Sequence, residues 1–136
     1  MKRRLRAGLS AATICLTTPA FAASFDASRP FLCAAMEIQA CIPGGSCDVQ
    51  TADDMDAPRF LNVSLADKKI TATRPSGADV NAPIEVVRHA NDLMFLQGSQ
   101  EMFSWTMTIG EKDGKMVLTL ADNEDGIVVF GACTNH

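Results

Sequence analysis

Residues 101–120 read EMFSWTMTIGEKDGKMVLTL, and two runs in this stretch place apolar side chains at every second position. The apolar side chains of the first run are Phe103, Trp105, Met107 and Ile109. Those of the second run are Met116, Leu118 and Leu120. This alternation is typical of a β-strand with one buried and one solvent-exposed face. Glu-Lys-Asp-Gly at 111–114 supplies a turn between the runs, so the stretch predicts a β-hairpin.

Shorter stretches elsewhere in the chain alternate in the same way or form β-branched runs bounded by turn residues. They lie at 31–41, 60–65, 69–74, 84–89, 93–97 and 127–130. Together with the hairpin they give about eight short strands and no convincing long helix, which predicts a mainly β domain. An antiparallel sandwich and a small meander closed into a β-barrel both fit this spacing. We favour the barrel, because closure removes the exposed edges of a small sheet.

Three segments give a weaker signal. In 31–41, Met36, Ile38 and Ala40 alternate with polar residues, which favours a strand; a short helix is the alternative, since several of these residues are good helix formers. Residues 44–58 show no periodicity, and residues 75–83 are rich in breakers such as proline and glycine. We interpret these last two segments as loops.

The first 22 residues have the pattern of a secretory signal peptide. Lys2, Arg3, Arg4 and Arg6 precede a run of apolar and small residues that ends in Ala20-Phe21-Ala22, with small residues where a signal peptidase reads. We expect residues 1–22 to be removed, residues 23–30 to form a flexible tail and residues 31–136 to form one β-domain. The expected location is the periplasm or the exterior of the cell, with no membrane attachment after cleavage.

Cleavage would make the chain strongly acidic. It removes four of the 12 Lys and Arg residues and none of the 16 Asp and Glu residues, which changes the net charge from −4 to −8. This balance argues against nucleic acid and against an anionic membrane surface as partners. A basic protein or a cation would suit it better, although acidity also serves simply to keep a small protein soluble.

Four cysteines remain after residue 22, and an even number in an exported chain predicts two disulfides. Cys41 and Cys47 flank a Pro-Gly-Gly turn, which favours their pairing. Cys33 with Cys133 would then join the first strand to the last. The spacings are wider than in a typical four-cysteine zinc site, and there is no Cys-x-x-Cys redox motif.

No arrangement of residues predicts an enzyme. His89 is the only histidine besides the terminal His136, and no Gly-x-Ser-x-Gly motif surrounds any serine. We therefore expect no catalytic residue, no cofactor and no metal site.

Two features remain as candidates for binding. Trp105 would be a ligand-stacking platform if the barrel has an open mouth, although its apolar neighbours also suit a core anchor. Asp53, Asp54 and Asp56 share one loop and offer oxygen ligands to a cation, with solvated turn residues as the alternative interpretation.

Several runs together carry a resemblance. They are Pro58-Arg59-Phe60-Leu61, Leu96-Gln97-Gly98, Ser104-Trp105 and Phe130-Gly131-Ala132-Cys133-Thr134. In this order they resemble small uncharacterised exported proteins of Gram-negative bacteria, a resemblance that implies no activity. The chain is also similar to the C-type lysozyme inhibitor family, because it is expected to be a small exported protein with a small β-barrel and a disulfide between its first and last strands. That family's Ser-Gly-Ala recognition run is replaced here by Gly98-Ser99-Gln100-Glu101, so no inhibitory residue is assigned.

These observations lead to two functional hypotheses. The first is a non-enzymatic periplasmic binding or interaction protein; an inhibitor that docks as an acidic protein on a basic enzyme would be its sharpest form. The alternative is a carrier of a small ligand or a divalent cation, which would use the barrel mouth or the loop that contains Asp53, Asp54 and Asp56.

Overall fold

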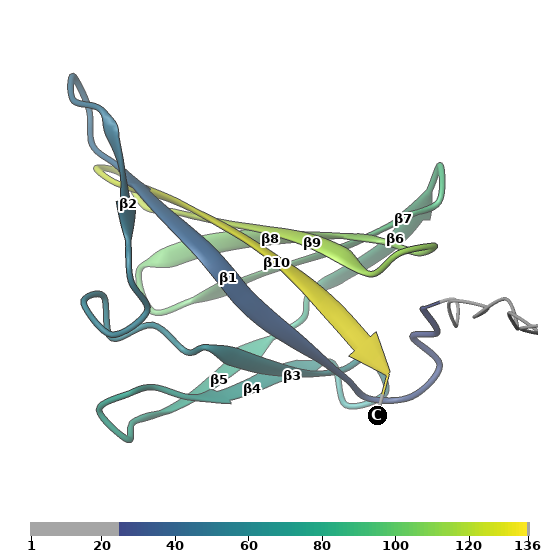
Figure 1. Cartoon of the computed structure of the whole chain (residues 1–136). Helices are drawn as coiled ribbons and strands as arrows, with labels where there is room; N and C mark the ends of the chain where they lie inside the picture. Colours follow the sequence, from purple (N-terminus) through teal and green to yellow (C-terminus); the bar gives the residue numbers. More distant parts are fainter. Residues whose placement is uncertain (1–24, 136) are drawn as a thin grey trace, which may run out of the picture.

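Alternating apolar side chains fold the chain into ten strands. The computed structural model describes residues 25–135, so the expected signal peptide at 1–22 lies outside the described residues (Figure 1). The strands are β1 (Phe31–Cys41), β2 (Cys47–Gln50), β3 (Phe60–Ser64), β4 (Lys69–Thr73), β5 (Asp79–Pro83), β6 (Val86–Ala90), β7 (Leu93–Gln100), β8 (Phe103–Gly110), β9 (Lys115–Ala121) and β10 (Gly126–Asn135). Between residues 25 and 135 there is no helix of the length and apolarity needed to cross a membrane.

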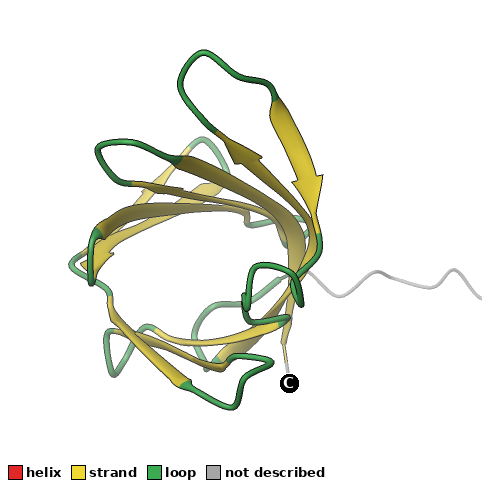
Figure 2. Ribbon diagram, turned by 90° about the vertical axis from the view of Figure 1, so that its left-hand side faces the viewer, coloured by secondary structure: helices red, strands yellow, loops and turns green. Residues whose placement is uncertain are grey.

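One antiparallel sheet contains all the strands, in the order β5-β4-β3-β1-β10-β9-β8-β7-β6, with β2 paired to β1. In Figure 1, β3–β5 lie below and β6–β9 above, and β1 and β10 run diagonally between the two groups. The strands follow a ring in Figure 2. The structure therefore confirms the mainly β, barrel-like prediction and shows one curled sheet, not a sandwich of two.

The two edges of the sheet belong to one continuous segment, residues 79–90. Its first half, β5, pairs with β4, and its second half, β6, pairs with β7. At the corner between them, the Ile84 N–H donates to the Lys68 carbonyl (2.9 Å) and the Glu85 N–H donates to the Gln97 carbonyl (2.8 Å). Consecutive residues thus bond to opposite sides of the sheet, which draws it into a barrel.

Gly98 allows this corner to approach β7 closely. A Cβ atom at Gly98 would lie 2.2 Å from the Pro83 carbonyl oxygen and 2.6 Å from Cζ2 of Trp105. Beside it, the Glu85 carboxylate accepts hydrogen bonds from the N–H (3.1 Å) and the hydroxyl (2.6 Å) of Ser99. The closure of the barrel therefore depends on a position without a side chain.

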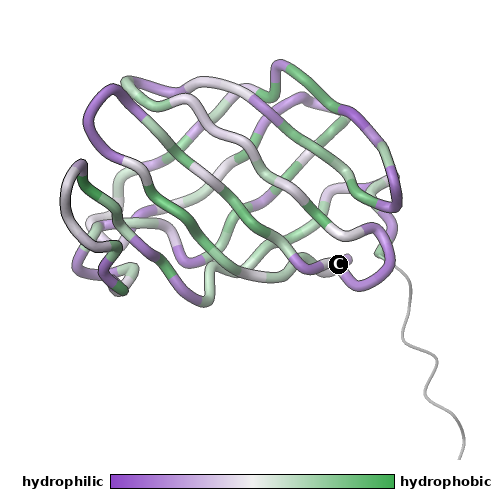
Figure 3. The backbone as a smooth tube through the Cα atoms, turned by 90° about the horizontal axis from the view of Figure 1, so that it is seen from above, coloured by the Kyte–Doolittle hydropathy of each residue, from purple (hydrophilic) through white to green (hydrophobic). Residues whose placement is uncertain are grey.

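Hydrophilic and hydrophobic residues alternate along much of the backbone (Figure 3). Large side chains fill one end of the barrel. The largest fully buried apolar side chains are Phe31, Val63, Met94, Leu96, Met107, Ile109 and Met116. Phe25 and Ala27 pack against this core, and the Phe25 ring meets the Phe31 ring edge to face at 4.9 Å. The described part of the predicted tail thus lies on the packed end.

Both predicted disulfides are present. Cys33 and Cys133 are buried and stand directly opposite each other in the β1–β10 pair. Cys41 and Cys47 join the last residue of β1 to the first of β2. Disulfides persist in oxidising compartments, so the pairs indicate a location outside the cytosol.

Two segments predicted as loops contain strands, so the count is ten and not about eight. β2 lies within 44–58; three of its four residues are exposed and none is buried, so it has no apolar alternation to detect. β5 lies within 75–83, where the prolines obscured the short alternation of Val80 and Ala82. β10 also continues five residues beyond the predicted end at Phe130.

β1 is a strand as predicted, but its buried face changes sides. Phe31 and Cys33 point into the core, and a β-bulge between Ala35 and Glu37 then shifts the register. Beyond it Ile38 is 3% exposed, whereas Met36 is 77% exposed. The expectation that Met36 and Ile38 share one face is therefore wrong, because a bulge inserts an extra residue and reverses the alternation.

Removing the disulfide between β1 and β10 should destabilise the fold more than removing the one in the hairpin. The Cys33–Cys133 bond closes a separation of 100 residues, and the double change to alanine should lower the free energy of unfolding by about 4–5 kcal/mol. The Cys41–Cys47 bond closes a separation of 6, for which the same chain-entropy relation gives about 2 kcal/mol. Urea unfolding of both double variants measures the difference, and equal losses would contradict the prediction.

Gly98→Ala should lower the free energy of unfolding by about 1–3 kcal/mol, because the added methyl group overpacks the corner against Pro83 and Trp105. Gly126→Ala is the matched control, since a Cβ there meets no atom within 4 Å. Thermal or urea unfolding compares the two variants. A Gly98→Ala protein as stable as the Gly126→Ala protein would refute the close approach.

Candidate functional site

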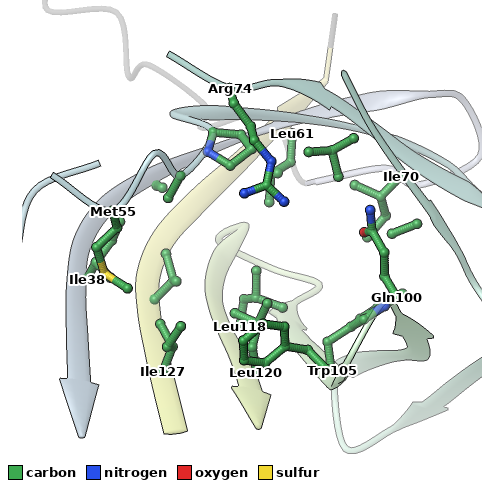
Figure 4. A pocket seen from close by; sticks show the side chains of 17 residues that line it. Ile38, Met55, Leu61, Ile70, Arg74, Gln100, Trp105, Leu118, Leu120 and Ile127 are labelled. Carbon is green, nitrogen blue, oxygen red and sulfur yellow. The ribbon is translucent and has the colours of Figure 1, made fainter. Parts of the chain in front are cut away.

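The barrel end opposite the packed core contains a cavity of about 300 Å³ (Figure 4). Its wall combines inward side chains from eight strands with the segment between β2 and β3. Of its 17 lining residues, only Arg74, Gln100 and Trp105 carry polar side-chain atoms. The volume lies at the lower end of the range found for small-molecule sites, which are also mainly apolar with a few polar groups.

The cavity follows from where the sequence places large and small inward residues. At the packed end, β7, β8 and β9 contribute Met94, Met107 and Met116. At the other end, β1 and β5 contribute Ala35 and Ala82. Protein interiors are normally packed to the density of organic crystals. Small side chains at these two inward positions therefore leave space that the chain itself does not fill.

Trp105 lies between the core and the cavity. Its side chain is 5% exposed and lines the cavity, with its ring against Gly98. Its Nε1–H is buried and has no hydrogen-bond partner among residues 25–135. Buried donors are almost always paired, and an unpaired one costs roughly 1–3 kcal/mol. Both predicted roles of Trp105, core anchor and ligand platform, fit this position.

Arg74 and Gln100 place polar groups in an otherwise apolar wall. Both side chains are half-buried. Figure 4 shows Arg74 and Gln100 extending into the cavity from different elements. The Arg74 guanidinium donates one long hydrogen bond, 3.4 Å, to the Asp56 carbonyl, and it forms no ion pair with any of the described residues.

Sequence reasoning did not single out these two residues, although a signal for Arg74 was present. Ile70 and Ala72 are buried at alternate positions of β4, and Arg74 is the next position in the same alternation. A cation on the buried face of a predicted strand is unusual enough to mark a site. Gln100 follows the polar end of β7 and gives no comparable signal.

The loop with the three aspartates forms part of the cavity wall through Met55, Ala57 and Pro58. Asp56 has a left-handed backbone (φ 47°) and accepts hydrogen bonds from the Ser76 N–H (2.8 Å) and hydroxyl (2.7 Å). These bonds hold the pKa of Asp56 below its usual value, and the charge of Arg74 contributes less. The loop is thereby fixed to the turn that follows β4.

The three aspartates do not converge on one point. Asp53 pairs with Arg59, Asp54 accepts a hydrogen bond from the Thr51 hydroxyl (2.5 Å), and Asp56 faces Ser76. Within residues 25–135, no group of three or more His, Cys, Asp or Glu side chains is arranged to hold a metal ion. The loop therefore does not assemble the oxygen cluster that a cation site requires.

His89 lies outside the cavity. It sits in β6 with an exposed side chain, and its Nδ1 is 2.5 Å from the Glu111 carboxylate. No serine or cysteine lines the cavity. The cavity can thus enclose a ligand and provide a few hydrogen-bond donors to it, which suits ligand binding.

Asp56→Asn tests how the loop is held. The lowered pKa means that the Asp56 charge stabilises the fold above the unfolded pKa of about 3.9, and that this contribution is lost as the pH falls through the folded pKa. Asparagine tolerates the left-handed backbone. The variant should therefore be less stable than the wild type above about pH 5, with the difference fading at lower pH.

Urea unfolding across this pH range measures the effect. Asp125→Asn is the control, because it removes the same charge from a side chain that makes no hydrogen bond within the described chain. A stability difference for Asp56→Asn that does not change with pH would contradict the assignment.

The chain matches no known family model, and it has no significant match among curated proteins or solved structures. The resemblance to lysozyme inhibitors therefore stays an expectation.

Proposed function

We propose that this is a non-enzymatic binding protein of the periplasm that holds a small, largely apolar ligand inside its barrel. The observation that carries the proposal is the cavity at the open end, whose apolar wall contains a buried Trp105 N–H with no hydrogen-bond partner among residues 25–135. A ligand with an acceptor atom would fill the space and satisfy that donor.

The periplasmic location has two supports. The first residues have the sequence pattern of an export signal. The two disulfides also suit an oxidising compartment. A soluble ligand carrier in that compartment needs no assembled catalytic group, which agrees with the place of His89 outside the cavity.

Among the hypotheses from the sequence, the small-ligand carrier has the firmest geometric support. A divalent cation has less, because the carboxylates of Asp53, Asp54 and Asp56 each face a different partner. Inhibition of a basic enzyme is supported by the acidic charge of the chain alone.

A titration with 1-octanol tests the proposal. Trp105 is the only tryptophan, and the chain contains no tyrosine, so intrinsic fluorescence reports on the cavity wall alone. Octanol should change the Trp105 emission saturably and raise the melting temperature, since a ligand that binds only the folded state stabilises it. An unchanged emission and melting temperature up to the solubility limit would refute binding of apolar ligands.

Ala82→Phe should reduce octanol affinity at least tenfold, because the added ring occupies the cavity. Asn81→Phe is the matched control: it adds the same ring to the neighbouring position of β5, whose side chain is exposed. Both variants are first compared by their thermal melts without ligand. Equal octanol affinities of the two folded variants would place the binding site elsewhere.

A further inference from the structure

We infer that the natural ligand of the cavity is an amphiphile with an anionic head group, a medium-chain carboxylate, whose head binds at Arg74. The inference rests on the proposed function and specifies its ligand. It is drawn from the charge, the donors and the size of the cavity.

Arg74 gives the cavity its charge. Among residues 25–135 it is the only ionisable residue that lines the cavity, and no aspartate or glutamate of this part of the chain lines it. A half-buried cation normally has a carboxylate partner, because desolvation of an unpaired charge is costly. The Asp56 carboxylate nearby is bound to Ser76 and forms no ion pair with Arg74. The cavity thus has a positive charge that forms no ion pair with any of residues 25–135, and the nearby Asp56 carboxylate does not line the cavity.

The hydrogen-bonding groups of the wall point to the same chemistry. A guanidinium has five N–H donors and no acceptor, and an indole N–H is also a donor only. Arg74 uses its donors for one 3.4 Å bond, and the Trp105 Nε1–H makes none within the described chain. Gln100 is the one lining side chain that offers both a donor and an acceptor. A ligand rich in hydrogen-bond acceptors would therefore complement this wall. A carboxylate is such a ligand group, and arginine binds it through two parallel hydrogen bonds.

The volume sets the length of the apolar part. A cavity of about 300 Å³ has room for about ten molecules of liquid water at roughly 30 Å³ each. A ligand held inside it therefore has on the order of ten non-hydrogen atoms. The lining side chains outside the three polar residues are aliphatic or aromatic, so they suit an alkyl chain of about eight carbons that extends from the head group.

Three ligands of nearly equal size separate the possibilities: octanoate, 1-octanol and octylammonium. Each has eight carbons in an unbranched chain, and the three differ in head-group charge. Binding to the wild-type protein at neutral pH is followed by Trp105 fluorescence and by calorimetry. Octanoate should bind at least tenfold more tightly than octanol, and octylammonium more weakly than octanol. Raising the ionic strength should weaken octanoate binding and leave octanol binding unchanged.

Arg74→Gln should abolish the preference for octanoate and leave octanol affinity within about threefold, since the head-group contact is lost and the apolar wall remains. Arg74→Lys should keep part of the preference, because lysine retains the charge without the bidentate fork. Arg59→Gln is the control: Arg59 is exposed, pairs with Asp53 and does not line this cavity. It should behave as the wild type.

The results distinguish this inference from the proposed function. If octanol binds and octanoate binds no more tightly, or if folded Arg74→Gln keeps the preference, the inference is overturned and the proposed function stands. If neither ligand binds the wild type, both are overturned. The comparison of the three ligands on the wild-type protein tests the inference even if the Arg74 variants do not fold.

Discussion

The pairing of the first strand with the last is the constraint on which the molecule depends. Cys33 stands opposite Cys133, and the covalent bond between them fixes the register of β1 against β10. β1 then pairs with β3 on its other edge, which places the β3–β5 group beside the β7–β10 group. With that junction fixed, the segment 79–90 can serve as both remaining edges, because one half faces β4 and the other half faces β7.

This closure divides the interior into two unequal parts. Long, flexible methionine side chains fill one end. The other end is lined by mainly aliphatic side chains, three of them alanines, and by an indole N–H that has no partner among the described residues. If the cavity stayed dry and empty, a coefficient of about 24 cal/mol per Å³ would put its cost near 7 kcal/mol, comparable to the whole stability of a small domain. The space therefore has to be occupied by solvent or by a ligand, and its wall favours an apolar body with an acceptor at one end.

The sequence predicts features whose signals are local or covalent, and it misses those that depend on contacts between distant segments. The hairpin of β8 and β9 was predictable because alternation and turn chemistry agree over 20 consecutive residues. The disulfides were predictable from cysteine parity and a short turn. The bulge at Ala35–Glu37 was not, because only the pairing with β10 reveals it. The cavity was anticipated only through Trp105; Arg74 was overlooked, although it continues the buried face of β4.

The acidity of the chain and the cation in its cavity act over different distances. The sequence suggests a basic partner because acidic residues outnumber basic ones. At physiological ionic strength, however, exposed charges more than about 8 Å apart are largely screened. The choice of a ligand is therefore made by the groups that touch it, and within the cavity these are one guanidinium, one amide, one indole N–H and an apolar wall. In the proposed complex, Arg74 acts on an anion at contact distance, where salt screens a charge pair much less. The net charge of the chain and the charge of the cavity therefore bear on different interactions, and the position of Arg74 in the folded barrel is what brings its charge to the cavity.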